Sequence, residues 1–123
     1  MNNKLVYLAI PYTWNPLRSF EIANKVAAVL MQQGYTVFSP ISHSHPINQY
    51  LPEEVRTQLG FWLDQDCTIL AHCEIIFLVT VEQCGQKLIE NSPGCQRELS
   101  EARDLNIPLQ HILYEDDRVS FLS

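Results

Sequence analysis

The chain has 123 residues and a formal net charge of −6, with eight basic side chains against fourteen acidic ones. The acidic balance argues against a partner that is a nucleic-acid polymer, but it leaves a single nucleotide possible, since a helix N-terminus can hold one phosphate. The length suits one domain with a modest core, and the apolar fraction of 46% is that of a folded chain. The sequence has no stretch long and apolar enough for a membrane span and no signal-peptide pattern, so we expect a cytoplasmic protein.

The first half of the chain predicts a strand, a helix and a second strand. Residues 5–10 form a continuous apolar run, which suits a strand covered on both faces. Apolar residues then recur at helical spacing between a start signal at Asn15 and a stop signal at Gly34. A short strand follows over 35–38, and the polar composition of 42–46 predicts a loop.

The second half continues this alternation. The expected elements are a short helix from 52, a helix over 61–72 set off by Gly60, a strand over 74–80, a loop over 81–91, a helix from 93, a strand over 108–113 and an acidic tail over 114–123. Alternating strands and helices predict a parallel sheet with helices on both faces. We therefore expect a single α/β domain over residues 1–123, flavodoxin-like or Rossmann-like, with about four to five strands in the order 2-1-3-4.

The helix expected from Pro93 carries a carboxylate, Glu98, on its apolar face. Ser92 suits the N-cap, and Pro93 suits the first helical position. One face of this helix is formed by Cys95, Glu98, Ala102 and Leu105. A carboxylate on such a stripe is either paired or poised for chemistry.

Asp66 interrupts a second apolar stripe in the same way. That stripe is formed by Leu59, Leu63, Asp66, Leu70 and Cys73. The structural alternative is that Asp66 lies at the edge of the stripe and pairs with an arginine. Two inward carboxylates near one sheet edge favour glycosidic bond cleavage, in which one stabilises the anomeric carbon and the other assists the leaving group. Tyr7 in the first strand could hydrogen-bond Glu98, although core packing alone would also explain a tyrosine there.

Ligands of parallel sheets bind at the carboxyl ends of the strands. That edge contains the loop formed by Ile10, Pro11 and Tyr12 and the helix start at Ser92 and Gly94. Free N–H groups and the helix dipole make such a helix start suitable for an anion. Because Pro93 lacks an N–H, we expect the donors to come from Gly94 and Cys95.

The residues that commonly bind metals form no recognisable ligand set. The four cysteines contain no Cys-x-x-Cys pair, which argues against a zinc ribbon and favours reduced, packed thiols. His43 and His45 form a His-x-His pair without a third ligand at suitable spacing. We expect these histidines to line the substrate pocket or to be solvated, and we expect no metal and no cofactor.

Several motifs together resemble the nucleoside 2-deoxyribosyltransferase superfamily. They are Tyr7-Leu8-Ala9-Ile10-Pro11-Tyr12, Asp66 followed by Cys73-Glu74, and Ser92-Pro93-Gly94-Cys95-Gln96-Arg97-Glu98 followed by Ala102. The motifs Phe38-Ser39-Pro40-Ile41 and Ser44-His45-Pro46-Ile47 resemble a small bacterial branch of unknown function. That branch is related to deoxynucleoside-monophosphate N-hydrolases, and the resemblance covers nearly the whole chain.

The resemblance implies a role for each matching residue. Glu98 matches the nucleophile that forms a covalent deoxyribosyl intermediate, Asp66 the carboxylate that assists protonation of the base, and Tyr7 the tyrosine that orients the nucleophile. Ser92 stands where the transferases tend to have an aspartate for the sugar 5′-hydroxyl and where the monophosphate hydrolases have a serine for a 5′-phosphate. Relatives complete their pockets with a neighbouring subunit, which implies a homodimer or larger homo-oligomer.

These observations predict an enzyme that hydrolyses or transfers the N-glycosidic bond of a (deoxy)nucleoside 5′-monophosphate or a related small nucleotide. Two positions depart from the pattern of the branch. Gly85-Gln86 stands in place of Gly-Trp, with a longer stretch before Ser92, and Cys73-Glu74 stands in place of Cys-Asp. Retention of Tyr7, Asp66 and Glu98 favours an enzyme, whereas the altered loop favours the alternative of a non-catalytic nucleotide-binding or sensing domain. A third alternative is a hydrolase of an unrelated phosphorylated metabolite.

Overall fold

The computed structural model describes residues 4–81 and 85–122. The described strands are β1 (Leu5–Ala9), β2 (Thr36–Phe38), β3 (Ile75–Val81), β4 (Leu109–Glu115) and β5 (Arg118–Leu122). The described helices are α1 (Pro16–Gln32), α2 (Pro40–Asn48), α3 (Glu53–Arg56), α4 (Leu59–Leu70), α5 (Gly85–Glu90) and α6 (Pro93–Asp104). The strands form one sheet in the order β2-β1-β3-β4-β5, in which only β5 runs antiparallel to its neighbour. The predicted α/β class and the strand order 2-1-3-4 are confirmed.

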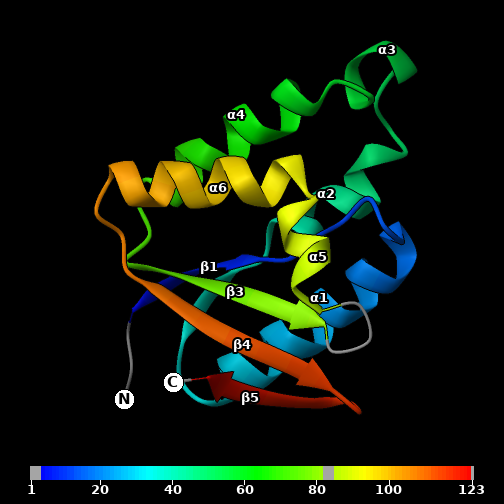
Figure 1. The fold of residues 1–123 in the computed structure, drawn as a ribbon. Helices are drawn as coiled ribbons and strands as arrows, with labels where there is room; N and C mark the ends of the chain where they lie inside the picture. The colour runs from blue at the N-terminus through cyan, green and yellow to red at the C-terminus, as the bar shows by residue number, and fades with distance from the viewer. Residues whose placement is uncertain (1–3, 82–84, 123) are drawn as a thin grey trace.

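Helices cover both faces of this sheet (Figure 1). One face packs on α1, where Val6 and Leu8 of β1 join the apolar side of the helix in one buried cluster. The other face packs on α4, α5 and α6, and there Tyr7 and Ala9 belong to a second cluster. Because side chains alternate along a strand, β1 sends Tyr7 to the side of the sheet that carries α6.

The predicted acidic tail is wrong, because residues 118–122 form strand β5. The chain reverses at Asp116 and Asp117, whose φ angles of 50° and 60° lie in the left-handed region that a tight hairpin turn needs. Aspartate tolerates this region better than most residues. The Asp117 carboxylate also accepts hydrogen bonds from Tyr114 and from Lys25 of α1, which holds the hairpin against the helix.

The predicted loop over 42–46 is also wrong, since these residues lie in α2. Serine, histidine and proline are typical of loops, but Pro40 occupies a first-turn position where its missing N–H costs nothing. Pro46 lies inside the helix, and the imidazole of His45 stacks on Phe20 of α1 with ring centroids 4.4 Å apart. Packing on α1 therefore overrides the local composition.

Three further boundaries differ from the sequence-based expectation. Gly60 lies inside α4 and does not separate it from another helix. The expected loop over 81–91 contains α5, and its residues 82–84 lie outside the described part of the chain. The two predicted apolar stripes are shorter than expected, because Leu59 at the start of one is 48% exposed and Leu105 at the end of the other is 44% exposed.

Candidate active site

Glu98 is buried beneath the sheet-facing side of α6. The helix begins after Ser92, whose Oγ accepts a hydrogen bond of 3.2 Å from the N–H of Cys95. This cap fixes the first turn, and one turn later Glu98 is only 6% exposed. The hydroxyl of Tyr7, which is fully buried in β1, donates a hydrogen bond to Oε2 of Glu98. The contact that the sequence suggested between these two residues is therefore present.

The environment of Glu98 favours its neutral form. Burial raises the pKa of Glu98 to about 8; the hydrogen bond from Tyr7 works against this rise, and the negative charge of Asp66 adds to it. Burial and the neighbouring Glu98 and Asp66 raise the pKa of the Tyr7 phenol far above its ordinary value, so Tyr7 remains a donor. A carboxylate kept in such a site at pH 7 costs folding free energy, which is typical of functional groups.

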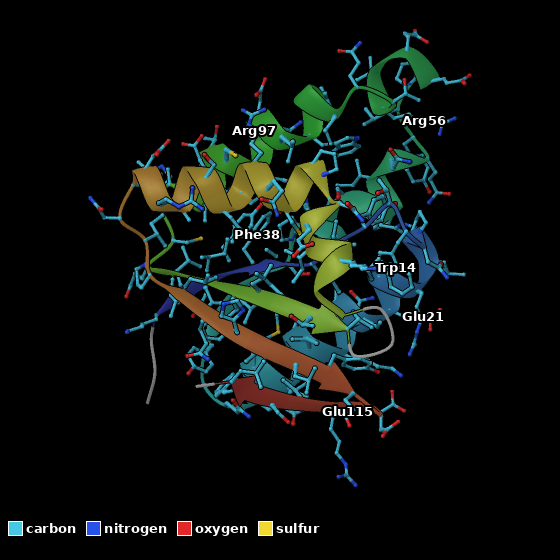
Figure 2. All side chains as sticks on the ribbon, viewed as in Figure 1. Trp14, Glu21, Phe38, Arg56, Arg97 and Glu115 are labelled. Atoms are coloured by element: carbon cyan, nitrogen blue, oxygen red, sulfur yellow. The ribbon has the colours of Figure 1, made fainter. Side chains whose placement is uncertain are left out.

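Asp66 lies on α4, which packs beside α6. An ion pair of 2.8 Å between Asp64 of α4 and Arg97 of α6 joins the two helices, and Figure 2 shows Arg97 between them. Burial raises the pKa of Asp66 to about 6. Among residues 4–81 and 85–122, no hydrogen bond is made to its carboxylate, which leaves Asp66 available to a ligand.

Asp66 and Glu98 line one cavity of about 410 Å³, beyond the carboxyl ends of β1 and β2. A volume of this size is typical of small-molecule sites. The described lining residues are Ile10, Tyr12, Thr13, Ile41, Ser44, Asn48, Arg56, Thr57, Leu59, Trp62, Leu63, Asp66, Ser92, Pro93, Gly94, Cys95 and Glu98. Five parts of the chain contribute to this lining: the loop after β1 and helices α2, α3, α4 and α6.

The structure places six of the expected substrate-binding or catalytic residues at this cavity, and Tyr7 contacts the cavity residue Glu98. Ile10, Tyr12, Ser92 and Gly94 line the cavity with both carboxyl groups. The remaining three residues, Pro11, His43 and His45, are not among its lining residues. The Pro11 carbonyl instead accepts hydrogen bonds from Trp14 and Ser19, His43 lies beside the ring of Phe38, and His45 lines a neighbouring cavity.

The sequence did not predict that residues of α2 and α3 line the cavity. Asn48, Arg56 and Thr57 all line the cavity, yet no spacing or motif distinguishes them. Trp62 of α4 also lines the cavity. Its indole N–H donates a 3.0 Å hydrogen bond to the carbonyl of Arg56, which links α3 to α4 at the rim of the cavity.

The described residues offer neither a metal site nor a membrane span. Within 4–81 and 85–122, no three His, Cys, Asp or Glu side chains gather closely enough to hold an ion. No helix in those ranges has the length and apolar character needed to cross a bilayer. Cys67, Cys73 and Cys95 are buried free thiols, in agreement with the expectation of reduced packing cysteines, while Cys84 lies outside the described residues.

Comparison with known proteins identifies the family of the chain. A family model described as a domain of unknown function, DUF1937, matches residues 4–112. The chain belongs to this family. No curated protein matches this DUF1937 domain at a significant level.

Solved structures of two 2-deoxyribosyltransferases have the same fold as the DUF1937 domain. One, from Bacillus psychrosaccharolyticus, superposes with a TM-score of 0.61 at 21% identity and covers 94% of this chain and 77% of its own. The other, from Leishmania mexicana, has a TM-score of 0.61 at 17% identity and covers 91% of this chain. The DUF1937 domain spans 65% of the length of the Leishmania protein.

The two carboxyl groups of the DUF1937 domain can divide the roles of acid and base. With pKa values of about 6 for Asp66 and about 8 for Glu98, the two groups together hold one proton between these pH values, and in the free site that proton lies mainly on Glu98. A pair that shares one proton offers a nucleophile or base together with an acid in the same cavity. The site is therefore chemically suited to cleaving a bond whose leaving group must be protonated.

Proposed function

We propose that this DUF1937 domain cleaves or transfers the N-glycosidic bond of a (deoxy)nucleoside 5′-monophosphate. The observation that carries the proposal is the presence of Glu98 and Asp66 on one cavity, with Tyr7 hydrogen-bonded to Glu98. The fold shared with proteins named as 2-deoxyribosyltransferases supports the same class of substrate. The match of several motifs to that superfamily, spread over most of the chain, adds independent support.

In the proposed reaction, the reactive form is the one in which the single proton of the pair lies on Asp66, and an oxygen of the ionised Glu98 bonds to C1′ of the sugar as the bond from C1′ to the base nitrogen breaks. The departing base takes the bonding electrons and receives a proton from Asp66. Water, or an acceptor base, then attacks C1′ and releases Glu98, while Asp66 accepts the proton of the attacking group. The Tyr7 hydroxyl fixes the rotamer of Glu98 and is a positioning group. Negative charge beside C1′ stabilises the oxocarbenium-like transition state.

The start of α6 is the proposed phosphate site. The expectation that Cys95 would donate to the anion is wrong, because its N–H is engaged by Oγ of Ser92. The available donors are therefore the N–H of Gly94 and the Ser92 hydroxyl hydrogen. Ser92 and Gly94 both line the cavity. The α6 dipole adds a favourable interaction with an anion, of about 0.3–1 kcal/mol at an exposed helix end.

Nucleoside 5′-monophosphates should therefore bind more tightly than the matching nucleosides, and Ser92→Asp should reverse this order. The introduced carboxylate would repel phosphate while accepting a hydrogen bond from a 5′-hydroxyl. Calorimetry with each ligand pair measures the effect, and Ser100→Asp, an exposed change on the same helix, is the control of equal charge. Equal affinity of the unmodified protein for nucleoside and monophosphate would show that Ser92 is only a helix cap.

The rate of base release should depend on pH as a bell centred near neutrality. Below about pH 6 the carboxyl pair holds two protons and offers no nucleophile, and above about pH 8 it holds none and offers no acid. The profile of kcat/KM against pH should therefore have limbs near these two values. In Asp66→Asn one limb should disappear and the rate should fall, whereas a bell unchanged by this substitution would remove Asp66 from the chemistry.

A panel of nucleosides and nucleotides assayed by liquid chromatography tests the proposal itself. Release of a free base from a nucleotide supports it. Binding of nucleotides without release of base at any pH between 5 and 9 would instead identify a non-catalytic nucleotide-binding domain. Release of phosphate from another metabolite, without release of base, would identify an unrelated hydrolase.

We propose further that the protein is a homodimer or a larger homo-oligomer. Leu59 at the cavity rim is 48% exposed and Tyr50 beyond α2 is 81% exposed, so the face near the cavity has apolar surface that a second subunit would cover. Light scattering should give at least twice the monomer mass of 14.2 kDa. A monomer at high protein concentration would contradict this assembly.

A further inference from the structure

A second cavity adjoins the one that contains Glu98. It has a volume of about 550 Å³ and is lined by Phe20, His45, Pro46, Asn48, Gln49 and Arg56. Asn48 and Arg56 line both cavities, so the two spaces meet at these side chains. The proposed cleavage at C1′ uses Glu98, Asp66 and Ser92, none of which lines the second cavity.

Arg56 carries the formal positive charge at this junction. No other lysine or arginine is among the described lining residues of either cavity. Within residues 4–81 and 85–122, no carboxylate pairs with the Arg56 guanidinium, in contrast to Arg18 and Arg97, which pair with Glu21 and Asp64. Figure 2 shows Arg56 on the α2–α3 side of the molecule.

His45 supplies a second donor to the same cavity and is rigidly held. Its ring stacks on Phe20, and its Nδ1 lies 2.7 Å from the hydroxyl of Tyr12. Burial raises the pKa of the Tyr12 phenol, so this hydroxyl keeps its proton and can donate it to Nδ1. An imidazole that accepts at Nδ1 carries a hydrogen on Nε2, where it is available as a donor.

We propose that the second cavity binds a phosphoryl group through the Arg56 guanidinium and the imidazole of His45. A guanidinium offers only donors, in a planar fork that matches phosphate oxygens, and a neighbouring imidazole N–H adds a further donor. The phosphoryl group belongs either to a nucleotide with a second phosphate or to a separate inorganic phosphate. The inference takes from the proposed function only the position of the nucleotide in the first cavity.

Tyr12 connects this subsite to the reaction cavity. Its side chain lines the first cavity, while its hydroxyl is bonded to His45 in the wall of the second. A phosphoryl group bound to His45 would therefore fix the orientation of Tyr12 beside the nucleotide. Both cavities would thus be filled either by one nucleotide with a second phosphate or by a nucleotide and an inorganic phosphate together.

Calorimetry with a nucleoside 5′-monophosphate, the corresponding 5′-diphosphate and the 3′,5′-bisphosphate tests the subsite. A second phosphate held by Arg56 should improve affinity by about tenfold or more, as charge-assisted hydrogen bonds do. Arg56→Gln should abolish this gain, so that the diphosphate and the bisphosphate bind within about twofold of the monophosphate. Arg56→Lys should keep part of the gain in affinity from the second phosphate. Arg118→Gln, an exposed change of the same charge on β5, should keep all of this gain.

A second arm distinguishes a separate ion from a phosphate on the nucleotide. Inorganic phosphate is titrated into protein saturated with the 5′-monophosphate, while NMR follows the ring resonances of His45. A shift that saturates in the unmodified protein and is absent in Arg56→Gln identifies a separate phosphate, even where the longer nucleotides gain nothing. This readout does not require the Arg56 variant to be active.

The proposal is overturned if no arm shows an effect that depends on Arg56. It is also overturned if Arg56→Gln weakens the monophosphate and the longer nucleotides by the same factor, because Arg56 would then act within the first cavity alone. Failure of the proposed cleavage has a different signature, since base release would be absent while these binding differences persisted.

Discussion

Replacing Glu98 with glutamine is expected to lower the rate of base release by at least about a thousandfold while the fold survives, because the amide cannot form an ester with C1′. Glutamine keeps the size of the side chain and can still accept the hydrogen bond from Tyr7. Initial rates from liquid chromatography measure the loss, and circular dichroism checks the fold.

Glu101→Gln is the matched control for this substitution. Glu101 lies one turn further along α6 and is not among the lining residues of the catalytic cavity, so its change should leave the rate within about twofold. A substrate that the Glu98 variant turns over at the normal rate would show that Glu98 is not the nucleophile.

Glu98→Gln is also expected to stabilise the protein at alkaline pH. Burial raises the pKa of Glu98 from 4.5 to about 8, so the unfolded chain releases this proton at lower pH than the folded chain. The stability of the unmodified protein should therefore fall as pH rises from about 4.5 to about 8. Glutamine does not titrate, so Glu98→Gln should gain several kcal/mol over the unmodified protein at pH 8, with a ceiling of about 5 kcal/mol.

Urea unfolding at pH 4.5 and at pH 8 measures this difference. The advantage of the Glu98 variant should be small at the lower pH and large at the higher one, whereas Glu101→Gln should change stability by less than about 0.5 kcal/mol at both. A Glu98 variant that is no more stable than the unmodified protein at pH 8 would contradict the burial of an ionisable group at this position.

Local signals were sufficient for the elements on which the candidate site is built. The apolar run of β1 and the cap at Ser92 are strong signals because each is complete within a few residues. The contact between Tyr7 and Glu98, which are 91 positions apart, followed from the strand order and from the face of α6 that carries Glu98.

Other parts of the molecule depend on contacts that the sequence does not display. The turn at Asp116 and Asp117 looks like part of an acidic tail until its pairing with Lys25 is known. Helix α2 has the composition of a loop and is held by packing on α1. Arg56 is a single arginine without a motif, and only the meeting of α2, α3 and α4 places it at a cavity.

The most direct test of the central claim is to trap the bond between Glu98 and the sugar. A nucleotide with fluorine at C2′ slows release of the sugar from the enzyme, because the fluorine destabilises the oxocarbenium-like transition state. Peptide mass spectrometry should find the fluorinated sugar phosphate on Glu98 in the unmodified protein and no adduct in Glu98→Gln. Release of base from this nucleotide with the label on another residue, or with no label under conditions where release of the sugar is slow, would contradict the account.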